Sequence, residues 1–155
     1  MEFSDLIHVI QSLNAPDAFK PRLTLAQWKS LEPYLIKREV PVSELLITQG
    51  EIDRTMYFIG RGSVSVFVNG AGDRSNRIAI LREGSVVGEP CLFASEPRMA
   101  NVEAIQDCVV WALRNPRFAE MAPRLPLLAL ELMRAAGEVM AVRWRACMES
   151  RIPFA

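Results

Sequence analysis

A segment near the middle of the chain combines a glycine, an acid and an arginine in a pattern suited to binding an anion. Residues 84–102 read GSVVGEPCLFASEPRMANV. Gly88 permits a close backbone approach, and Pro90 favours the first position of a short helix, whose unpaired amides attract anions. Arg98 carries a planar fork that can hydrogen-bond two phosphate oxygens. Glu89 is an acceptor for a sugar hydroxyl. Together these residues predict a site for phosphate plus ribose.

The spacing leaves a simpler interpretation open, in which Glu89 and Arg98 pair with each other as an ordinary salt bridge. Either way, no activated nucleophile and no acid–base pair stands out along the chain. The sequence therefore predicts a binding protein and not an enzyme.

The elements that must position this segment are short strands. Between residues 36 and 114, β-rich runs are divided by Gly, Pro, Asn and Asp, and a strand is expected to lead into Gly88. Many short strands at such spacing favour a closed or rolled antiparallel structure, because closure removes exposed edges. The predicted strands are Leu45–Thr48, Met56–Ile59, Ser63–Val68, Arg77–Leu81, Asn101–Ala104 and Val109–Leu113.

Helices are expected on both sides of the strands. Apolar residues recur at helical spacing from Phe3 to Leu13, a connector with two prolines spans Asn14–Arg22, and Thr24 caps a second helix. A short helix begins near Pro116. A longer one, from about residue 126 to 149, carries two apolar rows, whereas a surface helix on a small domain needs one. We therefore predict that this helix also packs on a second chain, as a homodimer.

The composition excludes several classes of partner. Lys plus Arg and Asp plus Glu are balanced at 18 each, so no net field favours nucleic acid or anionic lipid. No apolar run is long enough for a membrane span. Three scattered cysteines and one histidine predict reduced thiols in a cytoplasmic protein, with no metal and no resident cofactor.

The segment from Gly88 to Val102 closely resembles the phosphate-binding cassette of cyclic-nucleotide-binding domains. This family includes the bacterial cAMP receptor protein, the regulatory subunits of cAMP-dependent protein kinase, and gated channels. The matching pattern is Gly-Glu-x-x-Leu-Phe-x-x-x-Pro-Arg-x-Ala-x-Val. Weaker matches at Gln49–Glu51, Met56–Ile59 and the helix after Pro126 extend the resemblance roughly from residue 23 to residue 144.

The resemblance implies a mostly β fold with flanking helices. The expected architecture is an eight-stranded β-roll (a double-stranded β-helix or jelly roll) with N-terminal helices and a long C-terminal helix. One domain would span residues 1–155. Its N-terminal helices would occupy residues 1–35, its β-roll residues 36–114 with the cassette at 84–102, and its C-terminal helices residues 115–150.

The family also implies a role for each site residue. The glutamate, here Glu89, accepts from the ribose 2′-hydroxyl, and the arginine, here Arg98, clamps the cyclic phosphate. Backbone amides around Gly88 and Cys91 add donors. The long helix covers the base, and a gapless alignment places that cover near Met140, Arg143 and Trp144. Trp144 and Arg143 are equally interpretable as dimer-interface or core residues. The residues expected to contact the ligand are Gly88, Glu89, Cys91, Arg98, Met99, Ala100, Arg143 and Trp144.

Three residues depart from the family pattern, and one of them is Asn101, which replaces a common small or hydroxyl residue. Met99 stands where relatives usually carry Ala, Ser or Thr, so a hydroxyl contact to the ligand is lost. Pro90 removes one amide that some relatives point at the phosphate. These departures would weaken binding or favour an unusual ligand.

The resulting hypothesis is a sensor that binds a cyclic nucleotide, cAMP ahead of cGMP, and signals through its C-terminal helix to an unknown downstream protein. One alternative is an interaction module of the same fold that binds no nucleotide. Another is the sensor half of a truncated Crp/Fnr-type transcription regulator. The sequence stops soon after the long helix without a helix-turn-helix, so we expect no direct contact with nucleic acid.

Overall fold

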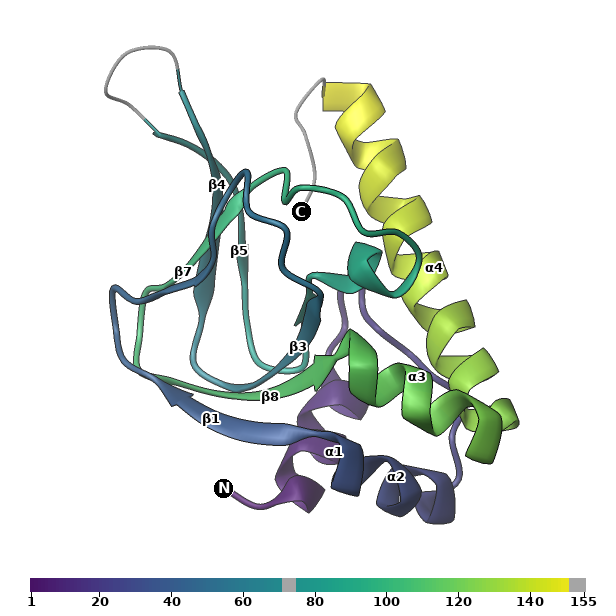
Figure 1. Ribbon diagram of the computed structural model, residues 1–155. Helices are drawn as coiled ribbons and strands as arrows, with labels where there is room; N and C mark the ends of the chain where they lie inside the picture. The colour runs from purple at the N-terminus through teal and green to yellow at the C-terminus, as the bar shows by residue number, and fades with distance from the viewer. Residues whose placement is uncertain (71–74, 151–155) are drawn as a thin grey trace.

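Two four-stranded antiparallel sheets form the centre of the molecule in a computed structural model that describes residues 1–70 and 75–150 (Figure 1). One sheet has the order β1-β8-β3-β6 and the other the order β2-β7-β4-β5. Apart from β4 and β5, which are consecutive in the chain, the hydrogen-bonded neighbours are far apart in sequence, which is the connectivity of a rolled sheet. The strands are β1 (Ile36–Val40), β2 (Leu45–Ile47), β3 (Thr55–Arg61), β4 (Val64–Asn69), β5 (Ser75–Leu81), β6 (Val86–Val87), β7 (Asn101–Ala104) and β8 (Cys108–Arg114).

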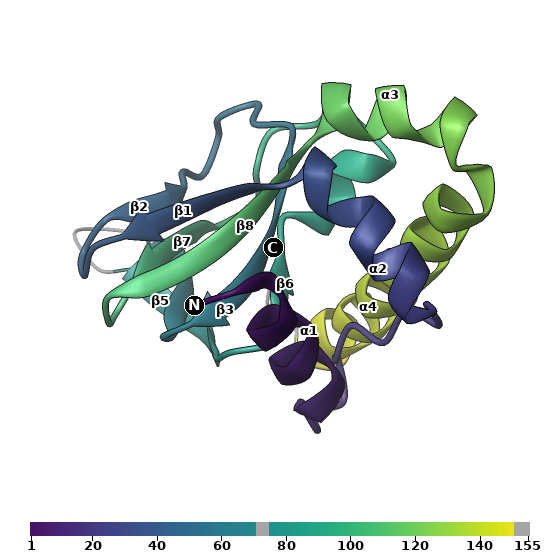
Figure 2. The ribbon, with the colours of Figure 1, turned by 90° about the horizontal axis from the view of Figure 1, so that it is seen from below.

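Helices pack against one side of this roll. Figure 2 shows α1 and α2 beside the β3–β8 sheet, with α3 and α4 completing the helical layer. Thr24 caps α2 as predicted, because its side chain accepts from the amide of Gln27. The helices are α1 (Phe3–Ser12), α2 (Leu25–Leu31), α3 (Asn115–Arg124) and α4 (Pro126–Ser150), with the 3₁₀ turns η1 (Glu32–Tyr34) and η2 (Glu89–Leu92).

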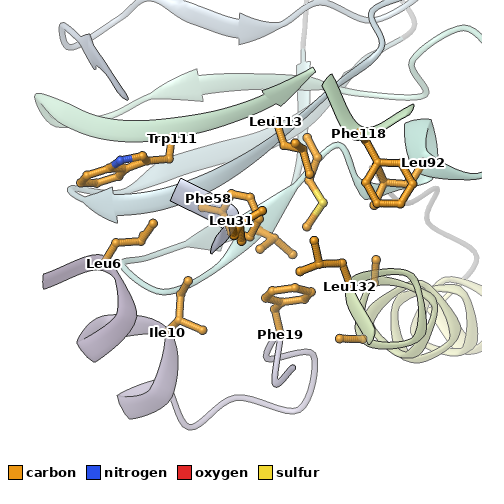
Figure 3. Close-up of a cluster of buried hydrophobic side chains, with 14 of the residues drawn as sticks. Leu6, Ile10, Phe19, Leu31, Phe58, Leu92, Trp111, Leu113, Phe118 and Leu132 are labelled. Atoms are coloured by element: carbon orange, nitrogen blue, oxygen red, sulfur yellow. The ribbon is translucent and has the colours of Figure 1, made fainter. Parts of the chain in front are cut away.

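The buried side chains form two clusters, one on each face of the β3–β8 sheet. One cluster fills the space between the two sheets and includes Ile59, Val66 and Val110. The other joins the sheet to the helices and includes Phe58, Trp111 and Leu132 (Figure 3). Consecutive residues Phe58 and Ile59 thus serve opposite clusters, as the two-residue period of a strand requires. The predicted fold, a mostly β roll with flanking helices and a long C-terminal helix, is confirmed.

One strand, β1, was absent from the sequence prediction. It pairs along its length with β8, from Ile36 opposite Ala112 to Val40 opposite Cys108. Four of its five residues are exposed, so the strand lacks the alternation of apolar and polar residues that reveals a half-buried strand. This strand is defined by its backbone pairing with β8, and such pairing produces no pattern in the sequence of β1 itself.

Candidate functional site

The segment 84–102 turns sharply at Gly88 and then forms a single helical turn. Strand β6 ends at Val87, Gly88 adopts a left-handed conformation with φ of 78°, and η2 begins at Glu89 with Pro90 in its first turn. A Cβ atom on Gly88 would lie 2.6 Å from the Thr55 carbonyl oxygen and 2.9 Å from Arg98 Nη1. Both the backbone angle and the close approach therefore require glycine here.

The far end of the segment is held by the loop before β3. The Arg98 amide donates to the Glu51 carbonyl at 2.8 Å, and the Gly50 amide donates to the Arg98 carbonyl at 2.9 Å. These two hydrogen bonds fix the backbone of Arg98 on the loop at residues 50–51, and from there its side chain reaches the Gly88 carbonyl.

A cavity of about 210 Å³ lies under this segment. Arg98 and Asp53 are the charged groups near its base, and Glu96 stands on its lining; most of the other lining residues are apolar. α4 contributes Met140. Phe93 and Met99 line the cavity yet are 45% and 54% exposed, so they form its open edge. The further lining residues are Ile47, Gly88, Pro90, Cys91, Ala94, Pro97 and Ala100.

Arg98 is the buried cation of this cavity, with 7% of its side chain exposed. Its Nη1 donates to the Gly88 carbonyl at 3.1 Å, its Nη2 donates to the Thr55 carbonyl, and Nη2 lies 3.5 Å from the Asp53 carboxylate. Its Nε is buried without a hydrogen-bond partner among the described residues. An unsatisfied donor on a buried charged group costs about 1–3 kcal/mol or more.

Glu89 is fully buried and faces α4. Both of its carboxylate oxygens accept from Arg143 Nη1 at 3.1 Å. Burial raises the pKa of the Glu89 carboxyl, and the Arg143 guanidinium opposes that rise. Within the described part of the chain, Glu89 is thus ion-paired with Arg143, and Arg98 with Asp53. The simple Glu89–Arg98 pair that the spacing left open is not formed.

The structure brings together five of the residues expected at the ligand site. Gly88, Cys91, Arg98, Met99 and Ala100 all line the cavity. The amide of Cys91, expected as a free donor, already donates to the Gly88 carbonyl at 3.2 Å.

The other three expected residues lie elsewhere. Glu89 is 0% exposed and lies between the lining residues Gly88 and Pro90 without itself forming part of the cavity surface. Arg143 donates to Glu89 at 3.1 Å, to the Val86 carbonyl at 2.8 Å and to Asp17 at 2.9 Å. Trp144 is 57% exposed on α4.

Sequence reasoning missed two acids of this site. Asp53 stands beside Arg98, and Asp17, in the connector before α2, contacts Arg143. Each acid is far along the chain from its arginine, and no local spacing marks it. The position of Asp53 beside Arg98 becomes apparent only once the loop around Gly50 and Glu51 is paired with Arg98.

Neither a metal centre nor a membrane span is found in the part of the chain that the structure describes. No group of three or more His, Cys, Asp or Glu side chains gathers there as metal ligands. No described helix is both long and apolar enough to cross a bilayer.

Comparison with known proteins identifies the family. The cyclic nucleotide-binding domain profile matches residues 37–124, from β1 through the cavity segment to the end of α3. The chain therefore belongs to the cyclic nucleotide-binding domain family, and it has the fold of that family's regulatory domains.

Individual relatives match over the same region. The cyclic AMP receptor protein of Thermus thermophilus is 28% identical over 99 residues, which cover 64% of this chain and 46% of the relative. The human potassium/sodium hyperpolarization-activated cyclic nucleotide-gated channel 3 is 33% identical over 99 residues, which cover 64% of this chain and 12% of the channel. The chain thus spans less than half the length of these curated relatives.

Solved structures confirm the fold. A cyclic nucleotide-binding domain from Methylobacillus flagellatus superimposes with a TM-score of 0.82 at 18% identity, covering 97% of this chain and 83% of that one. The catabolite activator protein of Thermus thermophilus gives a TM-score of 0.74 at 24% identity, covering 88% of this chain and 62% of that one.

Proposed function

We propose that this protein is a non-catalytic sensor that binds a cyclic nucleotide at the Arg98 cavity. The observation that carries the proposal is the Arg98 side chain, a buried cation on the cavity wall whose Nε has no partner in the described structure. A cyclic phosphate carries one negative charge and would pair with this guanidinium from the cavity. The relatives fit this role, since one is named a cyclic AMP receptor and another a cAMP-dependent protein kinase regulatory subunit.

The size of the cavity suggests how the ligand would lie. At about 210 Å³ it is smaller than the roughly 300–1,000 Å³ of typical small-molecule sites. We infer that phosphate and ribose occupy it, with the base extending past Phe93 and Met99 towards Met140 of α4.

The base-facing side of the cavity favours cAMP over cGMP. Phe93, Met99 and Met140 offer apolar and polarizable contacts but no hydrogen-bond donor or strong acceptor. Guanine carries more polar groups on its edge than adenine, so its desolvation there would be less well compensated. We expect about tenfold tighter binding of cAMP, the size of one uncompensated hydrogen bond.

Signalling through α4 is the second part of the proposal. The helix contacts the cavity segment through Arg143 on Glu89, and through Gly137, where an added Cβ would lie 3.6 Å from the Phe93 ring. A ligand that bears on η2 would therefore bias the position of α4. The outer face of α4 exposes Leu127, Leu130, Trp144 and Met148, which suits a homodimer and a downstream protein partner. A reducing compartment such as the cytoplasm suits the three free thiols.

A second candidate, an interaction module of the same fold without a nucleotide, has one observation in its favour. Arg98 already donates to two backbone carbonyls and faces Asp53, and Glu89 is already paired with Arg143. Such a site is partly satisfied without a ligand.

Isothermal titration calorimetry with cAMP and cGMP separates the two candidates. The sensor should give saturable heat for cAMP, and Arg98→Ala should weaken binding by about 2–5 kcal/mol, the range for removing one partner of a buried charged contact. We propose Glu89 as the acceptor for the ribose hydroxyl, so Glu89→Ala should weaken binding by about 1.5–3 kcal/mol. Flat traces at high protein concentration would favour the nucleotide-free module. Unchanged affinity in Arg98→Ala would remove the phosphate assignment.

A further inference from the structure

The connector between α1 and α2 is docked along α4 instead of crossing the surface freely. Phe19 is fully buried, and its ring packs edge-on against the Phe58 ring, with 5.6 Å between the ring centroids (Figure 3). The Lys20 carbonyl accepts from Arg134 at 3.4 Å, and the Arg22 amide donates to Glu131. The Asp17 carboxylate accepts from Arg143 Nε at 2.9 Å. Residues 17–22 therefore contact α4 at two places, at Glu131 and Arg134 and again at Arg143.

Arg143 uses every edge of its guanidinium in this arrangement. Nε donates to Asp17, Nη1 donates to Glu89 and Nη2 donates to the Val86 carbonyl. The side chain is 10% exposed, so its orientation is set by these partners and not by water. Asp17 is the partner that comes from outside both α4 and the cavity segment.

We propose that Asp17 is a positioning residue for the nucleotide site, because its carboxylate fixes the Arg143 guanidinium against Glu89 and so makes the N-terminal segment part of ligand recognition. This inference rests on the proposed function, in which Glu89 is the acceptor for the ribose hydroxyl. A buried carboxylate accepts well only while it is charged and correctly oriented. Arg143 supplies the compensating charge, and Asp17 holds Arg143 in place.

The titratable and charged groups around Glu89 come from three segments. Arg143 faces it from α4, and Arg98 acts on it from the cavity segment. Cys91 follows it in η2, and Asp17 reaches it through Arg143. Arg143 is the strongest of the influences that favour the charged carboxylate, so weakening its anchor should shift the titration of Glu89 upwards.

The ligand should in turn act on the connector. Coupling between two sites is reciprocal, so if Asp17 strengthens nucleotide binding, the nucleotide must strengthen the Asp17–Arg143 contact. Added cAMP should therefore slow hydrogen exchange of the amides in residues 15–22 as well as those in the cavity segment.

The test compares Asp17→Asn with the wild type and with two controls. Asp17→Glu restores the charge and should recover most of the affinity. Glu138→Gln removes a carboxylate that pairs with Arg134 on the same helix at 2.9 Å but does not contact Arg143, so it controls for general loosening of α4. Asp17 is 26% exposed, so solvent screening limits the effect, and Asp17→Asn should weaken cAMP binding about three- to tenfold. Glu138→Gln should leave it unchanged.

Two readouts keep the outcomes distinct. Calorimetry gives the affinities, and ¹³C NMR of the Glu89 carboxyl gives its titration without any ligand. Weaker binding together with an upward shift of that titration in Asp17→Asn supports the proposal. Unchanged or tighter binding in Asp17→Asn, or equal losses in Asp17→Asn and Glu138→Gln, overturns it. If the wild type binds neither cAMP nor cGMP, the proposed function fails, and an unshifted Glu89 titration then rejects the Asp17–Arg143 link as well.

Discussion

Gly88 offers a clean perturbation of the site, because the chain contains a matched control. Gly88 and Gly50 both have left-handed backbones, with φ of 78° and 88°. A Cβ on Gly88 would lie 2.6 Å from the Thr55 carbonyl and 2.9 Å from Arg98 Nη1, whereas a Cβ on Gly50 would meet nothing within 4 Å. Alanine at either position brings the same backbone strain, but at Gly88 it also collides with the arginine.

The expected magnitudes follow from this difference. Both variants should lose about 1–2 kcal/mol of unfolding free energy, because alanine is strained in the left-handed backbone. In both, alanine also restricts the unfolded chain, which offsets part of this loss equally. Gly88→Ala should lose roughly a further 1–3 kcal/mol, because the Thr55 carbonyl is backbone and cannot move aside easily. The displaced guanidinium should weaken cAMP binding at least about tenfold, or 1.4 kcal/mol, a part of what full removal of a buried charged contact costs.

Urea unfolding and calorimetry of the three proteins test this reasoning. Gly50→Ala should bind cAMP like the wild type once it is folded. If folded Gly88→Ala also binds like the wild type, or if the two variants are equally destabilised, the packing of Arg98 against Gly88 does not govern the site.

Three further predictions concern titration, thiol reactivity and assembly. Because burial raises the pKa of Glu89 above its usual value, the folded protein takes up this proton at a higher pH than the unfolded chain does. The contribution of Glu89 to stability should then grow as the pH falls through its folded-state pKa and be complete below about 4.5. The affinity for cAMP should fall over the same pH range. Urea unfolding and calorimetry against pH should show both trends in the wild type and neither in Glu89→Gln. Burial raises the pKa of the Cys91 thiol to about 11, so iodoacetamide at pH 8 should modify the more accessible Cys147 first. Mass spectrometry that shows Cys91 labelled fastest in the folded protein would contradict the burial. Leu130→Asp, on the outer face of α4, should shift sedimentation from dimer to monomer, whereas Leu25→Asp, equally exposed on α2, should not; identical sedimentation of the two variants would argue against the α4 interface.

The fold could be predicted largely from local sequence signals. The alternation in Val64–Val66 marks a strand, and Thr24 marks a helix start, since each signal lies in the element it defines. β1 could not be predicted, because its residues are mostly exposed and its pairing with β8 is a tertiary property.

In the site, too, the residues that could be predicted are those that lie close together in the sequence. Gly88 and Arg98 lie in one short segment, and the structure places both on the cavity wall. The partners of the buried charges could not be predicted in this way. Arg143 pairs with Glu89 and Asp17, and Arg98 with Asp53, through contacts that form only when distant segments pack. A motif identifies the groups that carry charge, whereas the fold decides which of them neutralise one another.

The structure of the protein crystallised with cAMP tests the central claim most directly. We expect an exocyclic phosphate oxygen within hydrogen-bond distance of the Arg98 guanidinium, with the base leaving the cavity beside Met99. A nucleotide bound elsewhere, or one seated in the cavity with its phosphate away from Arg98, would contradict this.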